Sequence, residues 1–319
     1  MTAGTGSEGG SSAGAREVVV DVSQLRMSYD GFEAVRGVDL RVCAGEIFAF
    51  LGPNGAGKTT TVEILEGHRR RTGGEVRVLG ADPQHADRRW RARVGVVLQT
   101  SRVEQELTVR ECLDLYAGYY PAPRPVKDVI KLVGLQKKAD VRGGLLSGGQ
   151  RRRLDVALAL IGDPELVFLD EPTTGFDPSA RRAAWEMIAG LRELGKTIFL
   201  TTHYMDEAQA LADRVAIIAG GEIVASGAPD ELGGRSTAAT EISFALVGAG
   251  GSDLPPLAAA ALAAPARNGA LRLRSEHPVE LLNELTSWAL ERGVELRGLE
   301  VRRPSLEDVY LELTGEPRE

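Results

Sequence analysis

The chain has 319 residues, of which 43% are hydrophobic and 26% are charged, so it is long enough for two globular domains of about 150 residues each. The net charge of −7 argues against general binding to nucleic acid, and no stretch reaches the roughly 18 uncharged apolar residues that span a bilayer. The two cysteines, Cys43 and Cys112, lack metal-ligand spacing, and we expect reduced thiols in a cytosolic protein.

The pattern along the chain predicts three parts. Residues 1–16 are rich in Gly, Ser, Thr and Ala without the apolar run of a signal peptide, and we expect a disordered N-terminal extension. Residues 17–232 carry every chemical motif and alternate short apolar strands with helical stretches, which predicts one α/β domain with a largely parallel sheet. A β-β-α-β-α pattern over residues 233–319 predicts a small C-terminal α+β domain, with a Gly/Pro/Ala loop at 248–266. The strands predicted for the α/β domain are 47–51, 94–98, 166–169, 197–201 and 215–218.

The segment from Gly52 to Thr59 fits G-x-x-x-x-G-K-[ST] and lies between an apolar strand and a helix that starts near Lys58. Its glycines let the backbone curve around anionic oxygens, and the amide N–H groups of the loop and the helix N-terminus present partial positive charge. We expect Lys58 to reach the β- and γ-phosphates of a nucleotide, and the Thr59 hydroxyl to bind Mg²⁺. A glycine-rich turn without a ligand is the alternative. The predicted phosphate-binding residues are Gly52, Asn54, Gly55, Gly57, Lys58, Thr59 and Thr60.

An apolar strand at 166–169 ends in two acids, Asp170 and Glu171. Mg²⁺ has to be held opposite the phosphate loop, at the carboxyl end of the sheet, and we expect Asp170 to bind it through water. The side chain of Glu171 points elsewhere and is placed to polarise the water that attacks the γ-phosphate. The alternative is a chance pair of acids at a strand end.

The pentapeptide Leu146-Ser147-Gly148-Gly149-Gln150 precedes a helix with apolar residues at helical spacing, so Ser147 can cap that helix and its N-terminus can meet an anion. Taken alone, it is equally a helix-capping turn. Together with the phosphate loop and the paired acids, in matching order and spacing over about residues 18–232, it resembles the signature of the ATP-binding cassette (ABC) family. The resemblance implies an ABC-type P-loop NTPase core with a helical signature subdomain inserted at about 100–160, and it implies ATP and Mg²⁺ as ligands.

The resemblance also assigns roles to single residues. It implies that Tyr29 stacks on adenine, that Gln99 touches Mg²⁺ and the attacking water, and that His203 contacts the γ-phosphate. Asp177, which follows Phe176 where the family usually has Leu, is expected to contact a second subunit. The alternatives are an ordinary half-buried strand aromatic at Tyr29 and a structural histidine at His203.

In this family the signature of one subunit covers the ATP held by the phosphate loop of another. Because this chain carries one copy of each motif, the resemblance implies a homodimer in which Ser147, Gly148, Gly149 and Gln150 bind the nucleotide of the second copy. Residues 107–111 match the surface that receives helices from a separate multi-span membrane permease. The expected protein is therefore cytoplasmic, peripheral on the inner face of the cell membrane, and without a nucleic-acid partner.

A looser likeness concerns the transported molecule. Residues 202–208 and 305–310 resemble the daunorubicin-resistance type of exporter ATPase, which implies efflux of a drug-like or lipid-like substrate and a part in antibiotic resistance. Two other functions stay open. One is a soluble ABC ATPase acting on a ribosome or a DNA-repair assembly, whose relatives carry two cassettes or a long coiled-coil insertion that this chain lacks. The other is a regulatory ATP-binding module without catalysis, against which the presence of both Glu171 and His203 argues.

Overall fold

The computed structural model describes residues 16–98, 104–232, 239–247, 253–262, 270–302 and 305–314. Nearly all of the predicted N-terminal extension, and Gln99, lie outside these residues. The chain divides into two compact units, Met1–His203 with Ile218–Ile223 and Tyr204–Ile217 with Val224–Glu319. In the described parts of the chain, no helix is long and apolar enough to cross a bilayer.

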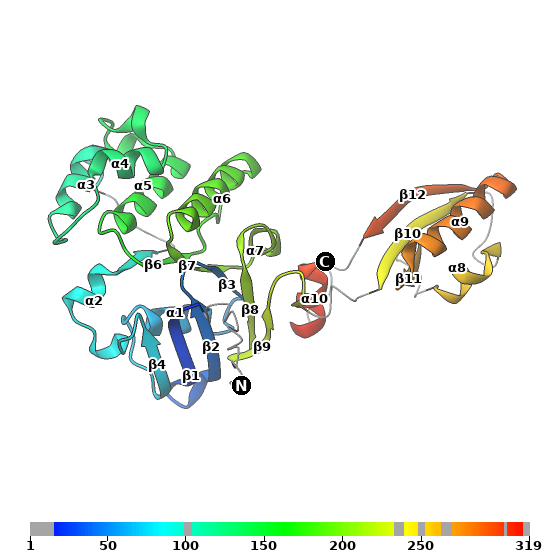
Figure 1. The fold of residues 1–319 in the computed structure, drawn as a ribbon, viewed down its shortest axis with the longest axis horizontal. Coiled ribbons are helices and arrows are strands. Elements are labelled where there is room, and N and C mark those ends of the chain that lie inside the picture. Colours follow the sequence, from blue (N-terminus) through cyan, green and yellow to red (C-terminus); the bar gives the residue numbers. More distant parts are fainter. Residues whose placement is uncertain are drawn as a thin grey trace, which may run out of the picture. The chain divides into compact units, whose positions relative to one another are not determined.

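The first unit begins with a three-stranded antiparallel sheet that the sequence analysis did not predict. Its order is β2-β1-β4, formed by β1 (Val18–Tyr29), β2 (Phe32–Cys43) and β4 (Gly73–Val78) (Figure 1). The turn between β1 and β2 is Asp30-Gly31, where both residues have positive φ (45° and 89°), as a two-residue hairpin turn requires. This turn pairs Tyr29 with Phe32 across the two strands.

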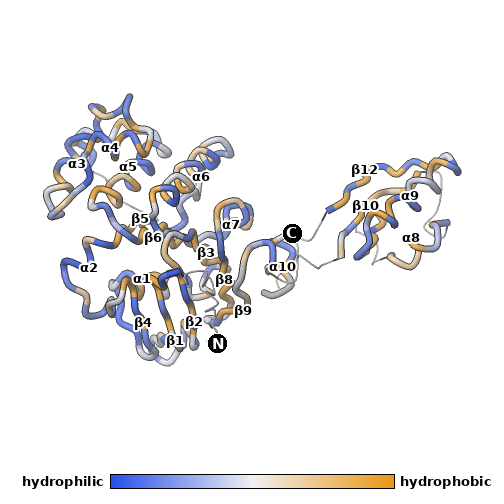
Figure 2. The backbone as a smooth tube through the Cα atoms, in the orientation of Figure 1, coloured by the Kyte–Doolittle hydropathy of each residue, from blue (hydrophilic) through white to orange (hydrophobic). Residues whose placement is uncertain are grey.

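The central sheet has six strands in the order β5-β6-β7-β3-β8-β9, and the neighbours from β5 to β3 are parallel. These strands are β3 (Ile47–Leu51), β5 (Val94–Val97), β6 (Leu166–Asp170), β7 (Thr197–Thr202), β8 (Arg214–Ala219) and β9 (Glu222–Gly227). Every residue of β3 and β7 is buried. The sequence of β3 is continuously apolar, whereas β7 buries three threonines besides Ile198, Phe199 and Leu200, and Figure 2 shows hydrophobic segments along this sheet. The predicted α/β fold is therefore confirmed. The loops after β3, β6 and β7 leave the same edge of the sheet because these strands are parallel.

The described residues of the first unit form the helices α1 (Lys58–Leu65), α2 (Arg88–Ala92), α3 (Val109–Ala117), α4 (Val126–Leu132), α5 (Gly148–Leu160) and α6 (Pro178–Glu193), with short 3₁₀ turns at Pro83–His85, Gln136–Lys138 and Gly143–Leu145. Helices α3, α4 and α5 contact one another and form a cluster of their own (Figure 1). Buried side chains such as Leu113, Val129 and Leu154 lie on these helices. The predicted helical stretches between the phosphate loop and the signature are thus present.

The second unit contains α7 (Met205–Leu211), α10 (Leu306–Thr314) and a small sheet of order β11-β10-β12, formed by β10 (Thr240–Val247), β11 (Leu271–Ser275) and β12 (Glu295–Arg302). Helix α9 (Pro278–Arg292) packs Leu281 and Leu285 against Ile242 and Phe244 of β10. One prediction was wrong here. The predicted loop at 248–266 contains a short helix, α8 (Pro256–Ala260), since Pro is favoured in a first turn and the run of Ala that follows has high helix propensity.

Candidate active site

The phosphate loop, Gly52 to Thr59, leaves the buried strand β3 and enters α1 at Lys58. Gly57 has φ of +103°, and a Cβ there would lie 2.6 Å from the carbonyl oxygen of Ala34. Gly55 has φ of +80° with open space around its Cβ position. The loop therefore needs glycine for its backbone shape at both positions, and at Gly57 also for close packing. The result is a loop whose end presents the N-terminus of α1 to a pocket.

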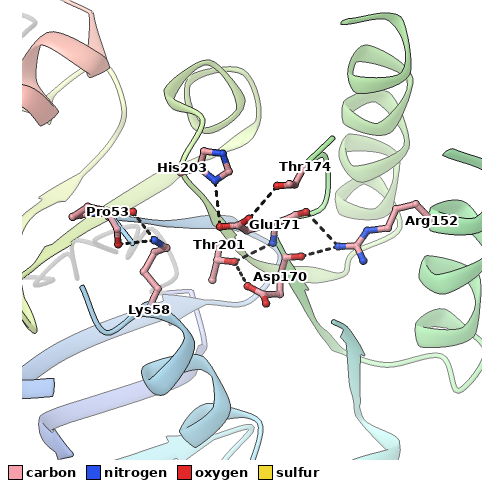
Figure 3. Close-up of polar contacts among 9 residues, drawn as sticks. Pro53, Lys58, Arg152, Asp170, Glu171, Thr174, Thr201 and His203 are labelled. Atoms are coloured by element: carbon pink, nitrogen blue, oxygen red, sulfur yellow. Dashed lines mark hydrogen bonds and ion pairs between the residues drawn. The ribbon is translucent and has the colours of Figure 1, made fainter. Parts of the chain in front are cut away.

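Lys58 is only 7% exposed, yet it carries the charge that a phosphate needs. Its Nζ donates to the carbonyl oxygens of Gly52 and Pro53, at 2.5 and 3.0 Å (Figure 3). Burial lowers the pKa of Lys58, and the negative charges of Glu171 and Asp170 oppose that shift. The loop thus holds the ammonium group in place with neutral acceptors, and a bound polyphosphate would supply the countercharge.

A pocket of about 440 Å³ joins this loop to the ends of β6 and β7. Besides Lys58, it is lined by Asn54, Gly55, Gly57, Thr59 and Thr60 from the loop and α1, by Asp170, Glu171 and His203 from the sheet edge, and by Tyr29, Phe32 and Ala34 from the antiparallel sheet. Gly52 lies behind this lining, because it is buried and has no room for a Cβ beside the carbonyl of Ile218. The structure therefore brings the predicted phosphate, metal and catalytic residues into one cavity, except Gly52, which does not line it, and Gln99, which lies outside the described residues.

Both acids are held by Thr201 of β7, the neighbour of β6 in the sheet. The Thr201 hydroxyl donates to Asp170 Oδ1 at 2.5 Å and accepts from the Glu171 N–H at 3.1 Å (Figure 3). On the carboxylate of Glu171, Oε2 accepts from the Thr174 hydroxyl at 3.0 Å and Oε1 lies 3.2 Å from His203 Nδ1. Glu171 is thus fixed at both ends beside the phosphate loop. Thr174 and Thr201 were missed in the sequence, since a threonine near the end of a strand or in the loop after one carries no signal by itself.

The fit of Mg²⁺ depends on Thr59 and Asp170. Among the described residues no group of three or more His, Cys, Asp or Glu side chains is arranged to hold a metal, so there is no all-protein cage in that part of the chain. The Thr59 hydroxyl and the Asp170 carboxylate line the same pocket as Lys58. Hard oxygen donors in this small number suit Mg²⁺, which takes one or two protein ligands and completes its shell with waters and substrate phosphates.

Two aromatic residues, Tyr29 and Phe32, also line the pocket. The Tyr29 ring is half-buried, with its hydroxyl 3.4 Å from Thr60 Oγ1 and the guanidinium of Arg69 5.3 Å from its centroid. Phe32, its hairpin partner, is 68% exposed and lines the same pocket. The sequence analysis missed Phe32, although the Asp30-Gly31 turn signal beside Tyr29 indicates such a cross-strand pair.

The signature residues do not line the pocket of the phosphate loop. Ser147 caps α5 through a capping box: its Oγ accepts from the Gln150 N–H at 3.3 Å, and Gln150 Oε1 accepts from the Ser147 N–H at 3.1 Å. A Cβ on Gly148 or Gly149 would meet nothing within 4 Å. Ser147, Gly148 and Gly149 line a different pocket of about 680 Å³, together with Asp177. This open helix N-terminus is available to an anion that comes from outside the chain.

Asp177 has a structural task that the sequence did not indicate, and its contact with a second subunit stays a prediction. Its Oδ1 accepts from the N–H groups of Ser179 and Ala180, both at 2.9 Å, and from the Ser179 hydroxyl at 2.7 Å, which caps α6. The N–H of Ala180 and the donors of Ser179 lower the pKa of the Asp177 carboxyl. Asp177 therefore stays ionised in the pocket beside Ser147.

Comparison with known proteins agrees with this geometry. The model of the ABC transporter family matches residues 35–174, and the model of the "ABC transporter domain-containing protein-like, C-terminal domain" matches residues 240–305. The "Nod factor export ATP-binding protein I" of Rhizobium sp. (strain N33) is 39% identical over 313 residues, which cover 95% of this chain and 99% of that protein. The protein of the same name from Ralstonia nicotianae is 39% identical over 308 residues, with 93% and 94% covered.

Solved structures show the same likeness over about two thirds of the chain. The structure of cbiO1 from Clostridium perfringens, described as part of the ABC transporter complex cbiONQ, has a TM-score of 0.62 and 26% identity. The match covers 67% of this chain and 90% of that one. A structure described as an ATP binding subunit of an ABC transporter has a TM-score of 0.61 and 26% identity, and covers 67% and 91%.

Proposed function

Because this chain belongs to the ATP-binding subunits of ABC transporters, which bind ATP with Mg²⁺ and couple its hydrolysis to transport, we propose that it energises an exporter from the cytoplasmic face of the membrane. It works there as a homodimer bound to a separate multi-span permease. The observation that carries this proposal is that the phosphate loop and the signature line two different pockets, and that Glu171 lines both. Lys58, Asp170, Glu171 and His203 share one pocket, whereas Ser147 lines another.

Within the first pocket each residue has a task that its surroundings favour. Lys58 and the amides at the start of α1 bind the β- and γ-phosphates of ATP. Thr59 and Asp170 hold Mg²⁺, which neutralises charge on the phosphate oxygens, and Gln99 is proposed to assist them. Glu171 accepts hydrogen bonds from the attacking water and orients it, while His203 contacts the γ-phosphate next to Glu171. The adenine base stacks on Tyr29 and reaches Phe32.

The dimer follows from the second pocket. In the described structure the signature N-terminus of α5 faces a pocket without Lys58 or Thr59, so one chain does not bring it to its own phosphate loop. In a two-fold pair, Ser147, Gly148, Gly149 and Gln150 of each copy would cover the ATP of the other, and Asp177 would lie at the contact. ATP would then hold the pair closed, and loss of the γ-phosphate would let it open.

The direction of transport and the class of cargo rest on relatives. Proteins named for Nod factor export match this chain over more than nine-tenths of its length, which supports export. A drug-like or lipid-like amphipathic molecule, as in the daunorubicin-resistance type, remains the proposed substrate, with antibiotic resistance as one outcome. The division into residues 17–232 for ATP and 233–319 for an accessory domain belongs to the same proposal, and the family match at 240–305 supports it.

The exporter role is tested by isolating the tagged full chain from detergent-solubilised membranes of its own cells. A multi-span membrane protein should copurify in equal amounts, and the isolated complex should hydrolyse ATP in a way that Glu171→Gln abolishes. Recovery of ribosomal or DNA-repair proteins in place of a membrane protein would contradict the transport role. Turnover by the Glu171→Gln complex at the normal rate would contradict the role given to Glu171.

A further inference from the structure

The guanidinium group of Arg152 donates hydrogen bonds to backbone carbonyl groups of two segments, Leu98 and residues 170–172. Its Nη1 donates to the carbonyl oxygen of Leu98 at 2.5 Å, and its Nη2 donates to that of Asp170 at 2.7 Å and of Glu171 at 3.4 Å. Its Nε donates to the carbonyl oxygen of Pro172 at 3.3 Å. Figure 3 shows Arg152 reaching from its helix to the end of β6. Three successive carbonyl groups, beginning with that of Asp170 at the end of β6, thus face one side chain.

This arrangement depends on an unusual backbone conformation at Glu171. Glu171 has φ of +44°, in the left-handed region that residues other than glycine adopt only at a cost in energy. On one side, its N–H is held by the carbonyl and the hydroxyl of Thr201, at 3.2 and 3.1 Å. On the other side, its carbonyl and those of its two neighbours turn towards Arg152. The left-handed turn at Glu171 is therefore clamped between β7 and α5.

Arg152 also lies at a junction between motifs. It is on the first turns of α5, the helix that Ser147 caps and whose N-terminus forms the signature. Leu98, its acceptor on the other side, is the residue immediately before Gln99. A displacement of the signature helix would therefore act through one rigid guanidinium on the backbone of Glu171 and on the chain that leads to Gln99.

We propose that Arg152 is a positioning residue for ATP hydrolysis, which holds the Glu171 backbone in its left-handed turn and links it to the signature helix. The inference rests on the proposed roles of Glu171 and of the signature. An ATP bound by the signature of one copy would, through Arg152, influence the carboxylate that acts on the other ATP. Arginine suits this task because its planar fork presents five donors, whereas lysine offers a single point charge.

The neighbouring arginines supply a matched control. Arg153 Nη1 donates to the carbonyl oxygen of Val133, at 3.4 Å, within the helical cluster. Arg153 therefore shares the helix, charge and partial burial of Arg152 without contacting the end of β6. Replacing either residue with Gln removes one positive charge from α5, and a difference between the two variants reports the contacts of Arg152 rather than the charge.

The test compares steady-state ATP hydrolysis by the full chain carrying Arg152→Gln, Arg152→Lys or Arg153→Gln. For Arg152→Gln we expect kcat to fall roughly tenfold to a hundredfold with the KM for ATP nearly unchanged, since the reacting groups are displaced and the phosphate loop is intact. Arg152→Lys should restore part of kcat, and Arg153→Gln should keep the normal kcat. A normal kcat in Arg152→Gln, or an equal loss in Arg153→Gln, would overturn the proposal.

A double variant separates positioning from general damage. If Arg152 acts through Glu171, then adding Arg152→Gln to Glu171→Gln should not slow the residual single-turnover rate any further. An equal loss in both backgrounds would overturn the proposal while leaving the role of Glu171 intact. Turnover by Glu171→Gln alone at the normal rate would instead refute the proposed function. If thermal melting shows that Arg152→Gln does not fold, Arg152→Lys replaces it in the comparison of the single variant with the double variant that also carries Glu171→Gln.

Discussion

The hydroxyl of Thr201 contacts both acids at the end of β6, and removing it tests how much this contact contributes to stability and to the proposed hydrolysis of ATP. Thr201 is 1% exposed and contacts Asp170 Oδ1 and the N–H of Glu171. Replacing Thr201 with Val keeps the branched shape and removes both bonds. A hydrogen bond to a charged group contributes about 1.5–3 kcal/mol to stability. Loss of the bond to the Glu171 N–H costs less stability, because this N–H still donates to the carbonyl oxygen of Thr201 at 3.2 Å.

We therefore expect Thr201→Val to lower the free energy of unfolding by about 2 kcal/mol, roughly a 30-fold change in the unfolding equilibrium constant. Thr201→Ser is the matched control, because it keeps the hydroxyl and loses one methyl group, which costs about 1 kcal/mol. Urea unfolding gives both values from the shift of the midpoint at constant slope. Thr201→Val should also hydrolyse ATP more slowly and need more Mg²⁺, since Asp170 is no longer oriented. A valine variant that is as stable as the serine variant, with a normal rate and Mg²⁺ requirement, would refute this reasoning.

Three further changes test other parts of the structure. Phe32→Ala should raise the KM for ATP severalfold with kcat unchanged, because stacking of the adenine base contributes about 1 kcal/mol to binding. Phe32 is too exposed to contribute much to the stability of the fold. An unchanged KM would show that Phe32 does not contact the adenine base. Lys58→Ala should abolish binding of a fluorescent ATP analogue while the thermal melting temperature stays close to normal; retained affinity would contradict the role of the phosphate loop. The two hydrogen bonds from Arg71 lower the pKa of Asp82 to about 2. The ion pair therefore stabilises the folded protein above pH 4, and this contribution is lost as the pH falls towards 2. Asp82→Asn should accordingly be less stable than the normal protein at pH 7 and equally stable near pH 2, as measured by urea unfolding; a difference that does not change with pH would show that the ion pair is not its cause.

Much of the central sheet and of the phosphate site could be predicted because each element carries its own local signal. Ile47–Leu51 is continuously apolar and runs into a glycine loop, which is typical of a buried strand before a phosphate loop. Leu166–Asp170 is apolar until it reaches its terminal acid, where the chain leaves the core. In both cases a buried apolar strand ends at one residue and a glycine or an acid follows, so the end of the strand is visible in the sequence.

The antiparallel sheet was missed for a physical reason. β1 and β2 alternate between buried and exposed residues only in part, since their pairing has several register shifts between Val18 and Ser28. Polar residues such as Gln24 and Arg26 interrupt the apolar pattern at these irregularities. A period-two pattern broken in this way does not stand out from a loop, although its Asp30-Gly31 turn does carry a signal.

The supporting contacts of the site could not be predicted because they join residues that are distant in sequence. The bond from Thr201 to Asp170 spans 31 positions, and the bond from Arg152 to Leu98 spans 54. Arg152 stands among three consecutive arginines, and nothing in their order indicates which one faces the end of β6. Only the packing of α5 against the sheet edge distinguishes them.

The central claim is that two copies of this chain must share ATP, each copy covering the nucleotide of the other with its signature. Light scattering of the purified Glu171→Gln protein with Mg²⁺ and ATP tests it most directly. The account predicts the mass of a dimer with ATP, the mass of a monomer without it, and a monomer again when Ser147→Arg blocks the open N-terminus of α5. A protein that binds ATP at Lys58 and stays monomeric, or a dimer that forms equally well with Ser147→Arg, would contradict it.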